Sequence, residues 1–103
     1  MGTQLDPITP GEILRDEFMA EYGLSQNKLA LDLNTPVSIV NRIVKNKLRI
    51  TADMALRLGK YFGTTAQFWM NLQTSYDLRI AERQTWPRIK DKVRQVQKTQ
   101  VEG

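Results

Sequence analysis

Apolar residues in the first part of the chain recur at the three- to four-residue spacing of one helix face. Leu14, Phe18 and Tyr22 form the first such stripe. The sequence TPGE at residues 9–12 matches a capping box with proline at the first helical position. Gly23 can adopt the left-handed conformation that ends a helix. The pattern therefore predicts a helix from about residue 10 to residue 22.

Two shorter helices follow, separated by a turn of three to four residues. Ser25 caps the first of them, and Leu24 and Leu29 are placed as a hydrophobic staple around that cap. Asn34 should end this helix, because asparagine tolerates a left-handed turn better than any residue except glycine. The Thr-Pro pair at 35–36 supplies a cap and a first-position proline for the next helix. The inward positions of the two helices are Leu29, Ala30, Leu33, Val40, Ile43 and Val44.

Two longer helices and a short tail helix complete the pattern. Asn46 can close the third helix, and Thr51 caps a fourth that Gly63 ends. A capping box at residues 64–67 opens a fifth helix that runs to about residue 82. Pro87 then interrupts the pattern. The apolar positions Ile89, Val93 and Val96 predict a last amphipathic helix.

The periodicity indicates an all-α fold, because no segment alternates apolar and polar residues as a strand would. The length suits one domain with a single core. We expect an N-terminal arm at residues 1–8, a five-helix domain at residues 9–82, and a basic tail with a short helix at residues 83–103.

Charge is unevenly distributed along the chain. Residues 1–32 carry six acidic against two basic side chains, a net charge of −4. Residues 33–64 carry six basic side chains against one acidic, and residues 65–103 carry seven against four. A strongly basic middle beside an acidic start indicates two surfaces with different partners, although solubility alone would also explain it.

Composition excludes several classes of function. The chain has no cysteine and no histidine, which removes Cys/His metal sites, Ser–His and Cys–His nucleophiles, and histidine general bases. Carboxylate-only enzymes remain possible, but the acidic residues lie at positions typical of exposed helix faces and not of a paired catalytic site. We therefore expect no enzyme activity, no metal and no cofactor. No apolar run reaches the roughly 20 residues of a membrane span. The N-terminus lacks the features of a signal peptide, so a cytoplasmic protein is expected.

The second and third helices together have the spacing of a helix-turn-helix, in which two helices cross steeply at a short turn. The third helix should bury Val40, Ile43 and Val44, so its opposite face must meet solvent. Arginine on that face can read guanine, asparagine can read adenine and valine can touch a thymine methyl, while lysine and glutamine reach phosphates. Each residue alone would usually be plain surface, but the turn and the local charge together favour DNA. The candidate DNA-contact residues are Gln26, Val37, Ser38, Asn41, Arg42, Lys45 and Lys47.

The span from about residue 10 to residue 82 resembles the HigA family of antitoxins, which are helix-turn-helix proteins of the Xre/Cro, lambda-repressor-like type. The resemblance rests on PGEILRDEF (10–18), LSQNKLA (24–30), RITADMALRLGKYFGTT (49–65) and AQFWMNLQTSYDL (66–78). The last segment is the most specific, because generic Xre/Cro domains lack its FW-NLQ-YDL pattern. The sequence departs from the family at Asn34 and Asn46, where glycine is common, and the tail from Arg83 onward matches no pattern.

The resemblance implies a function that periodicity does not. Proteins of this family bind operator DNA as dimers, repress their own operon and neutralise a partner toxin. That toxin is typically a small basic ribonuclease that cleaves messenger RNA, as in HigB. The same resemblance places the DNA contacts at the seven candidate residues named above.

A concentrated aromatic and apolar stripe lies on the fifth helix, at Phe68, Trp69, Leu72 and Tyr76. Part of the stripe must close the core. A domain of this size rarely buries two such faces, so we expect the stripe to contribute to a two-fold homodimer. Two recognition helices would then lie about 34 Å apart, one turn of DNA.

The toxin-binding surface has two candidates. The acidic first helix has the right sign to meet a basic ribonuclease, and equally the right sign to stay away from DNA. Its acidic residues are Glu12, Asp16, Glu17 and Glu21. The basic tail is a rival, because a short amphipathic helix often folds onto a partner. A stand-alone repressor without a toxin, and an interaction module that never touches DNA, remain alternatives.

Overall fold

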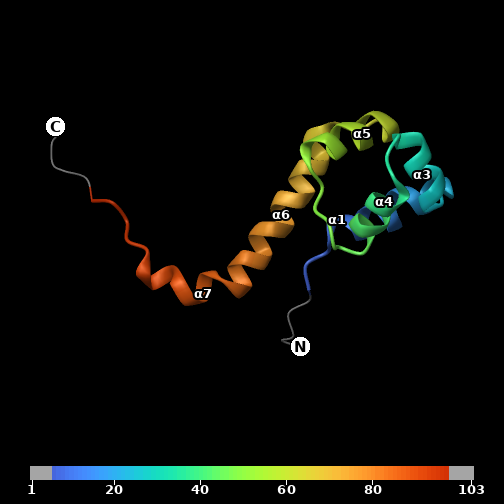
Figure 1. Ribbon diagram of the computed structural model, residues 1–103. Helices are drawn as coiled ribbons and strands as arrows, with labels where there is room; N and C mark the ends of the chain where they lie inside the picture. Colours follow the sequence, from blue (N-terminus) through green and yellow to red (C-terminus); the bar gives the residue numbers. More distant parts are fainter. Residues whose placement is uncertain (1–5, 98–103) are drawn as a thin grey trace, which may run out of the picture.

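The computed structural model describes residues 6–97, and among these every regular element is helical, with no strand. Pro10–Ile13 (α1), Leu14–Met19 (η1) and Ala20–Tyr22 (α2) form one continuous helix, whose middle portion is π-helical. The following helices are α3 (Gln26–Leu33), α4 (Val37–Val44), α5 (Ala52–Phe62), α6 (Ala66–Gln84) and α7 (Trp86–Ile89), with a 3-10 turn at Lys90–Lys92 (η2). The all-α, five-helix fold with a short helical tail is confirmed (Figure 1).

Local sequence signals set most of the helix ends. The side chains of Thr9 and Ser25 each accept a hydrogen bond from the backbone N–H three residues later, at 3.0 Å. Thr51 caps α5 in the same way at 3.3 Å. Asn34 and Asn46 have φ of 57° and 60°, so asparagine fills both left-handed positions where glycine was the alternative.

Two predicted caps are displaced by one residue. Pro36, and not Thr35, is the N-cap of α4, so that helix begins without a side-chain cap. Thr65, and not Thr64, caps α6 by accepting from the backbone N–H of Phe68. The hydroxyl of Thr64 instead accepts a hydrogen bond from the indole N–H of Trp69 at 2.8 Å. A buried indole needs such a partner, which explains the shift.

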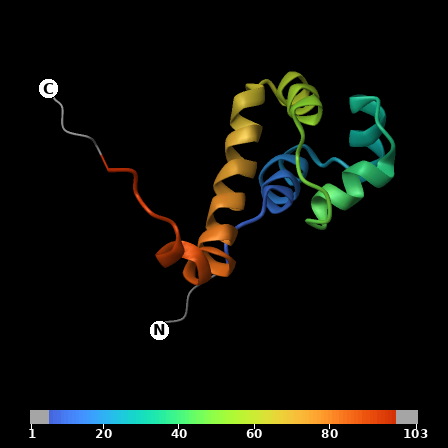
Figure 2. The same ribbon diagram turned by 60° about the vertical axis from the view of Figure 1, so that its left-hand side comes forward.

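The core lies where α1, η1, α3, α4 and α5 meet the first half of α6 (Figure 2). Its largest fully buried side chains are Trp69, Leu14, Leu29, Ile50, Leu58 and Val40. Gly11 permits the close approach of α1 to α4, since a Cβ there would lie 2.0 Å from the carbonyl oxygen of Ile43. Tyr22 departs from the predicted stripe and is 62% exposed, because the wider π-helical turn changes the angular spacing of the residues before it.

The second half of α6 leaves the domain and continues as a C-terminal arm, residues 78–97 (Figure 1). The Cα radius of gyration is 18.5 Å, whereas a compact domain of this length would have about 13 Å. The predicted tail helix is wrong beyond Lys92: Val93 is extended, and Val93 and Val96 are 58% and 86% exposed. Residues 1–5 of the predicted N-terminal arm and 98–103 of the tail lie outside the described residues. Across residues 6–97 no helix is both long and apolar enough to cross a membrane.

Candidate nucleic-acid interface

Helices α3 and α4 form the helix-turn-helix, joined by the three residues Asn34, Thr35 and Pro36. Helix α4 buries Val40, Ile43 and Val44 against the core. Its opposite face is exposed, and this is where the predicted reading residues lie. Val37, Ser38, Arg42, Lys45 and Lys47 are exposed, and Gln26 and Asn41 are half-buried.

One hydrogen bond joins the two helices of the motif across this face. The side-chain amide of Asn41 donates to the Oε1 atom of Gln26 at 3.0 Å. An amide side chain has both donor and acceptor groups, so the Gln26 NH2 and the Asn41 carbonyl oxygen keep their capacity for other partners. The structure therefore brings together two residues that the sequence places fifteen positions apart, and it fixes them as a pair.

The turn of the motif is held from outside by Arg57 of α5. One guanidinium nitrogen of Arg57 donates to the carbonyl oxygens of Leu33 and Asn34, each at 2.8 Å, and another pairs with Asp53. These carbonyls are at the C-terminal end of α3, where the last carbonyl oxygens of a helix have no N–H donor within the helix. The sequence places Arg57 among the basic residues of the middle segment, but in the structure its guanidinium caps the C-terminal end of α3.

A second structural link joins α3 to α5. The Tyr61 hydroxyl donates to Asp32 at 2.7 Å, and Lys28 forms an ion pair with the same carboxylate at 3.3 Å. The hydrogen bond from Tyr61, with a further contribution from Lys28, lowers the pKa of Asp32. The carboxylate in turn raises the pKa of the Tyr61 phenol. This link fastens the last turn of α3 to α5, at the end of the helix opposite Gln26.

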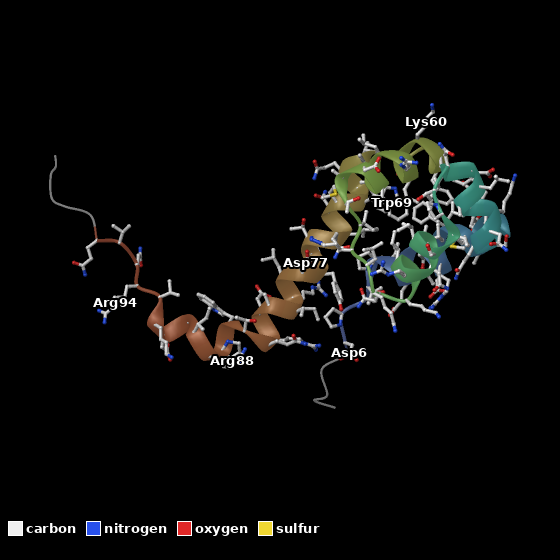
Figure 3. All side chains as sticks on the ribbon, in the orientation of Figure 1. Asp6, Lys60, Trp69, Asp77, Arg88 and Arg94 are labelled. Carbon is white, nitrogen blue, oxygen red and sulfur yellow. The ribbon has the colours of Figure 1, made fainter. Side chains whose placement is uncertain are left out.

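The segment after α4, residues 45–50, carries Lys45, Lys47 and Arg49 and is fastened to α6. Three pairs make the connection: Asn46 with Tyr76, Arg49 with Asp77, and the Ile50 backbone with Gln73. Figure 3 places Asp77 on α6, on the part of the helix below Trp69. Sequence reasoning missed these contacts. The spacing of residues 73, 76 and 77, which puts three polar side chains on one helix face, was the available signal.

Comparison of the sequence with known proteins establishes the family of this chain. The helix-turn-helix family model matches residues 15–69. Antitoxin HigA-1 of Vibrio cholerae is 30% identical over 76 residues, covering 74% of this chain and 71% of that protein. The chain belongs to the HigA family of helix-turn-helix antitoxins.

Two further relatives are more similar in sequence to this chain than the Vibrio cholerae antitoxin is. The solved structure of Pseudomonas aeruginosa antitoxin HigA with the higBA promoter superposes with a TM-score of 0.83 at 49% identity, covering 85% of this chain and 96% of that one. Virulence-associated protein I of Dichelobacter nodosus is 51% identical over 79 residues, covering 77% of this chain and 73% of that protein. The agreement extends beyond the helix-turn-helix into α6.

The aromatic stripe on α6, which the sequence predicts to contribute to a homodimer, packs mainly into the core. Trp69 is fully buried, and its ring packs tilted against Phe18, at 4.8 Å between ring centroids, and edge-on against Phe68 at 5.2 Å. Phe68 and Leu72 pack partly buried against the same cluster. Tyr76 is half-buried, and its hydroxyl is bonded to Asn46. Trp69 therefore offers no surface to a second copy.

The acidic residues of the first helix differ in their availability. Asp16, Glu17 and Glu21 are exposed, and Glu12 is half-buried near the helix start. Arg15 binds Asp16 through two hydrogen bonds, at 2.7 and 3.0 Å, and this lowers the pKa of the Asp16 carboxyl. Glu17 and Glu21 are thus the carboxylates of the first helix that are most accessible to a binding partner.

Proposed function

We propose that this protein is an antitoxin that binds operator DNA as a homodimer, represses its own operon and neutralises a messenger-RNA-cleaving ribonuclease of the HigB kind. The observation that carries the proposal is helix α4. It buries one face in the core and presents Ser38 and Arg42 on the other, beside the paired Gln26 and Asn41. The solved structure of the Pseudomonas aeruginosa relative contains antitoxin HigA with the higBA promoter, which supports operator binding by this chain.

In the proposed complex, α4 lies in the major groove. Arg42 reads guanine through its paired N–H donors, Asn41 reads adenine, and Val37 contacts a thymine methyl. Ser38 accepts from or donates to a base edge. The ammonium groups of Lys45 and Lys47 bind phosphates at the far end of the helix.

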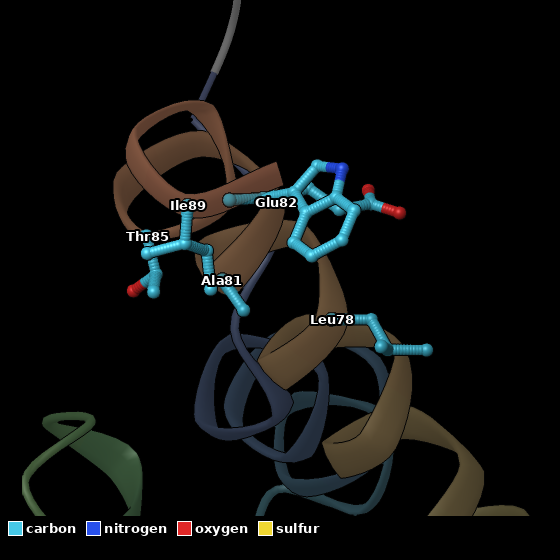
Figure 4. A pocket seen from close by; sticks show the side chains of 6 residues that line it. Leu78, Ala81, Glu82, Thr85 and Ile89 are labelled. Atoms are coloured by element: carbon cyan, nitrogen blue, oxygen red, sulfur yellow. The ribbon is translucent and has the colours of Figure 1, made fainter. Parts of the chain in front are cut away.

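The homodimer is proposed to form through the C-terminal arm instead of the buried stripe. Leu78, Trp86 and Ile89 are 58%, 43% and 38% exposed, and with Ala81 they line an apolar hollow on the arm (Figure 4). A second copy that places the same surface against this hollow covers both in a two-fold contact. Solvent exposure of large apolar side chains on a projecting helix supports this location.

The toxin is proposed to bind the acidic first helix. Glu17 and Glu21 are exposed and carry the sign that a basic ribonuclease needs. The exposed basic tail is the alternative surface.

The deciding experiment is a titration of the full chain against the DNA just upstream of its own gene, beside random DNA, at several salt concentrations. We expect much tighter binding to the upstream fragment, saturating at two protomers per site. Equal and weak binding to both DNAs would contradict the operator-binding proposal and favour an interaction module.

A stand-alone repressor is the second candidate, because the acidic helix would also serve simply to repel DNA from the wrong face. Co-purification separates the two. An antitoxin should retain the product of a small basic reading frame beside its gene, and a stand-alone repressor should purify alone.

A further inference from the structure

The segment that follows the recognition helix has no regular structure of its own. It is called the contact loop below and comprises residues 45–50. Its first residues continue from α4 through backbone bonds, including that from the Lys47 N–H to the Arg42 carbonyl at 2.7 Å. Asn46 then adopts the left-handed backbone conformation, which turns the chain. The loop has three exposed basic side chains, with Lys45 before Asn46 and Lys47 and Arg49 after it. The orientation of these basic side chains depends on the residues that hold the loop in place.

Gln73 of α6 holds the end of the contact loop. It is 4% exposed, and among residues 6–97 it is the only polar side chain that is buried to this degree. Its Oε1 atom accepts from the backbone N–H of Ile50 at 2.8 Å, and its NH2 donates to Asp77 at 3.0 Å. A buried amide is costly unless it is hydrogen-bonded, so the two bonds fix Gln73 and Ile50 together.

Asp77 and Tyr76 extend the same contact along the loop. The second carboxylate oxygen of Asp77 binds the guanidinium of Arg49. The Tyr76 hydroxyl accepts from the side-chain amide of Asn46 at 2.9 Å, midway between Lys45 and Lys47. Three adjacent side chains on one face of α6 therefore tie the loop at residues 46, 49 and 50.

We propose that Gln73, Tyr76 and Asp77 are positioning residues for DNA binding, which hold the contact loop so that Lys45 and Lys47 face the phosphates. The inference rests on the proposed DNA-binding function and deepens it. A loop that is ordered before binding loses less conformational entropy when it binds. The DNA affinity of the recognition unit is therefore set partly by α6, a helix outside the helix-turn-helix.

Tyr76→Phe tests the proposal with the smallest change, because it removes one hydroxyl from a half-buried position and leaves the ring. One lost hydrogen bond corresponds to roughly 3- to 10-fold weaker binding to the upstream DNA. Tyr61→Phe is the matched control: it also removes a hydroxyl that bonds between two segments, to Asp32 at 2.7 Å, but away from the contact loop. We expect Tyr61→Phe to change DNA affinity less than twofold.

A double-mutant cycle separates positioning from general stability. If Tyr76 acts through the loop lysines, Tyr76→Phe should have little further effect on DNA affinity once Lys45 and Lys47 are both changed to alanine. Fully additive losses from Tyr76→Phe and the combined Lys45→Ala and Lys47→Ala changes would overturn the proposal, as would equal DNA affinities for Tyr76→Phe and Tyr61→Phe. Sedimentation of each variant checks that the oligomeric state is the same in every comparison.

A measurement without DNA tests the same contacts. Gln73→Met keeps the side-chain volume and removes the acceptor of the Ile50 N–H, so amide hydrogen exchange in residues 45–50 should accelerate at least tenfold relative to residues in α3. Unchanged exchange there in both Gln73→Met and Tyr76→Phe would overturn the proposal. Failure of the wild-type chain to prefer the upstream DNA would instead contradict the proposed function, so the two failures are distinguishable.

Discussion

Asn41 and Gln26 share one hydrogen bond, and each keeps a polar group for a further partner. Replacing Asn41 therefore removes its own contact and also releases the side chain of Gln26. Arg42, by contrast, makes no side-chain hydrogen bond or ion pair that would hold it within the described chain, and its exposed guanidinium is free to read a base. The two neighbours should thus respond differently to substitution.

At this scale the first prediction concerns specificity. Arg42→Ala should weaken binding to the upstream DNA by about 1–3 kcal/mol and leave affinity for random DNA nearly unchanged. Lys47→Ala, the matched charge removal at a phosphate position, should weaken both DNAs alike and lower the salt slope by roughly one. Binding isotherms at several salt concentrations measure both effects. An equal loss of affinity for both DNAs in Arg42→Ala would show that Arg42 contacts the phosphate backbone of the DNA and not a base.

Single-residue roles were predictable only where the sequence carries them locally. Exposed positions on α4 follow from the helix period, and the left-handed conformations of Asn34 and Asn46 follow from their place at helix ends. The bonds of Gln26 to Asn41 and of Gln73 to Ile50 join residues 15 and 23 positions apart. The helix spacing of residues 73, 76 and 77 indicates a shared polar face, but no local pattern identifies the partners of these residues, because the pairs depend on how the helices pack.

At the scale of elements, the capping residues predicted correctly where helices begin. The prediction was wrong where a helix would have had no neighbouring element to pack against. Thr9, Ser25 and Thr51 each cap the helix that the sequence assigned to them. The predicted helix through Val93 and Val96 has apolar residues at helical spacing but no neighbouring element to cover them. Short helices are marginal without tertiary packing, so the pattern alone could not order that segment.

The close approach of α1 to α4 gives the prediction at this scale. Gly11→Ala places a methyl group on the backbone oxygen of Ile43, which cannot move without shifting α4, so we expect a loss of about 3 kcal/mol or more in unfolding free energy. Gly23→Ala is the control, because a Cβ at Gly23 meets no atom within 4 Å and only the left-handed φ of 63° is strained. Denaturant unfolding should show Gly11→Ala to be clearly the worse; equal losses would mean that α1 is free to move away from α4.

At the scale of the whole molecule, the extended shape separates a compact DNA-facing domain from the arm. The sequence predicted the helices of the domain but not which apolar stripe would remain outside. Trp69 and Leu78 lie on the same helix, yet Trp69 is fully buried and Leu78 is 58% exposed. Only the point at which α6 leaves the core decides between them, and that point is a property of the packed structure.

The arm gives the prediction at this scale. Leu78→Arg should dissociate the proposed dimer, because a guanidinium in the apolar hollow cannot be covered by a second copy. Leu56→Arg is the matched control, since Leu56 is 64% exposed on α5, outside the arm. Sedimentation velocity should find monomers for Leu78→Arg and an unchanged dimer for Leu56→Arg. The reverse result would move the interface to α5.

The exposed arm also makes the chain divisible by proteases. Beyond α6, the basic residues Arg88, Lys90, Lys92 and Arg94 are all exposed, and trypsin cleaves after such residues where the backbone is accessible. A cut in this stretch removes the end of the arm and leaves α3, α4 and the contact loop on an intact core. Limited digestion therefore releases a shortened DNA-facing fragment, and its loss of self-association would measure how much of the arm the pairing of two copies requires.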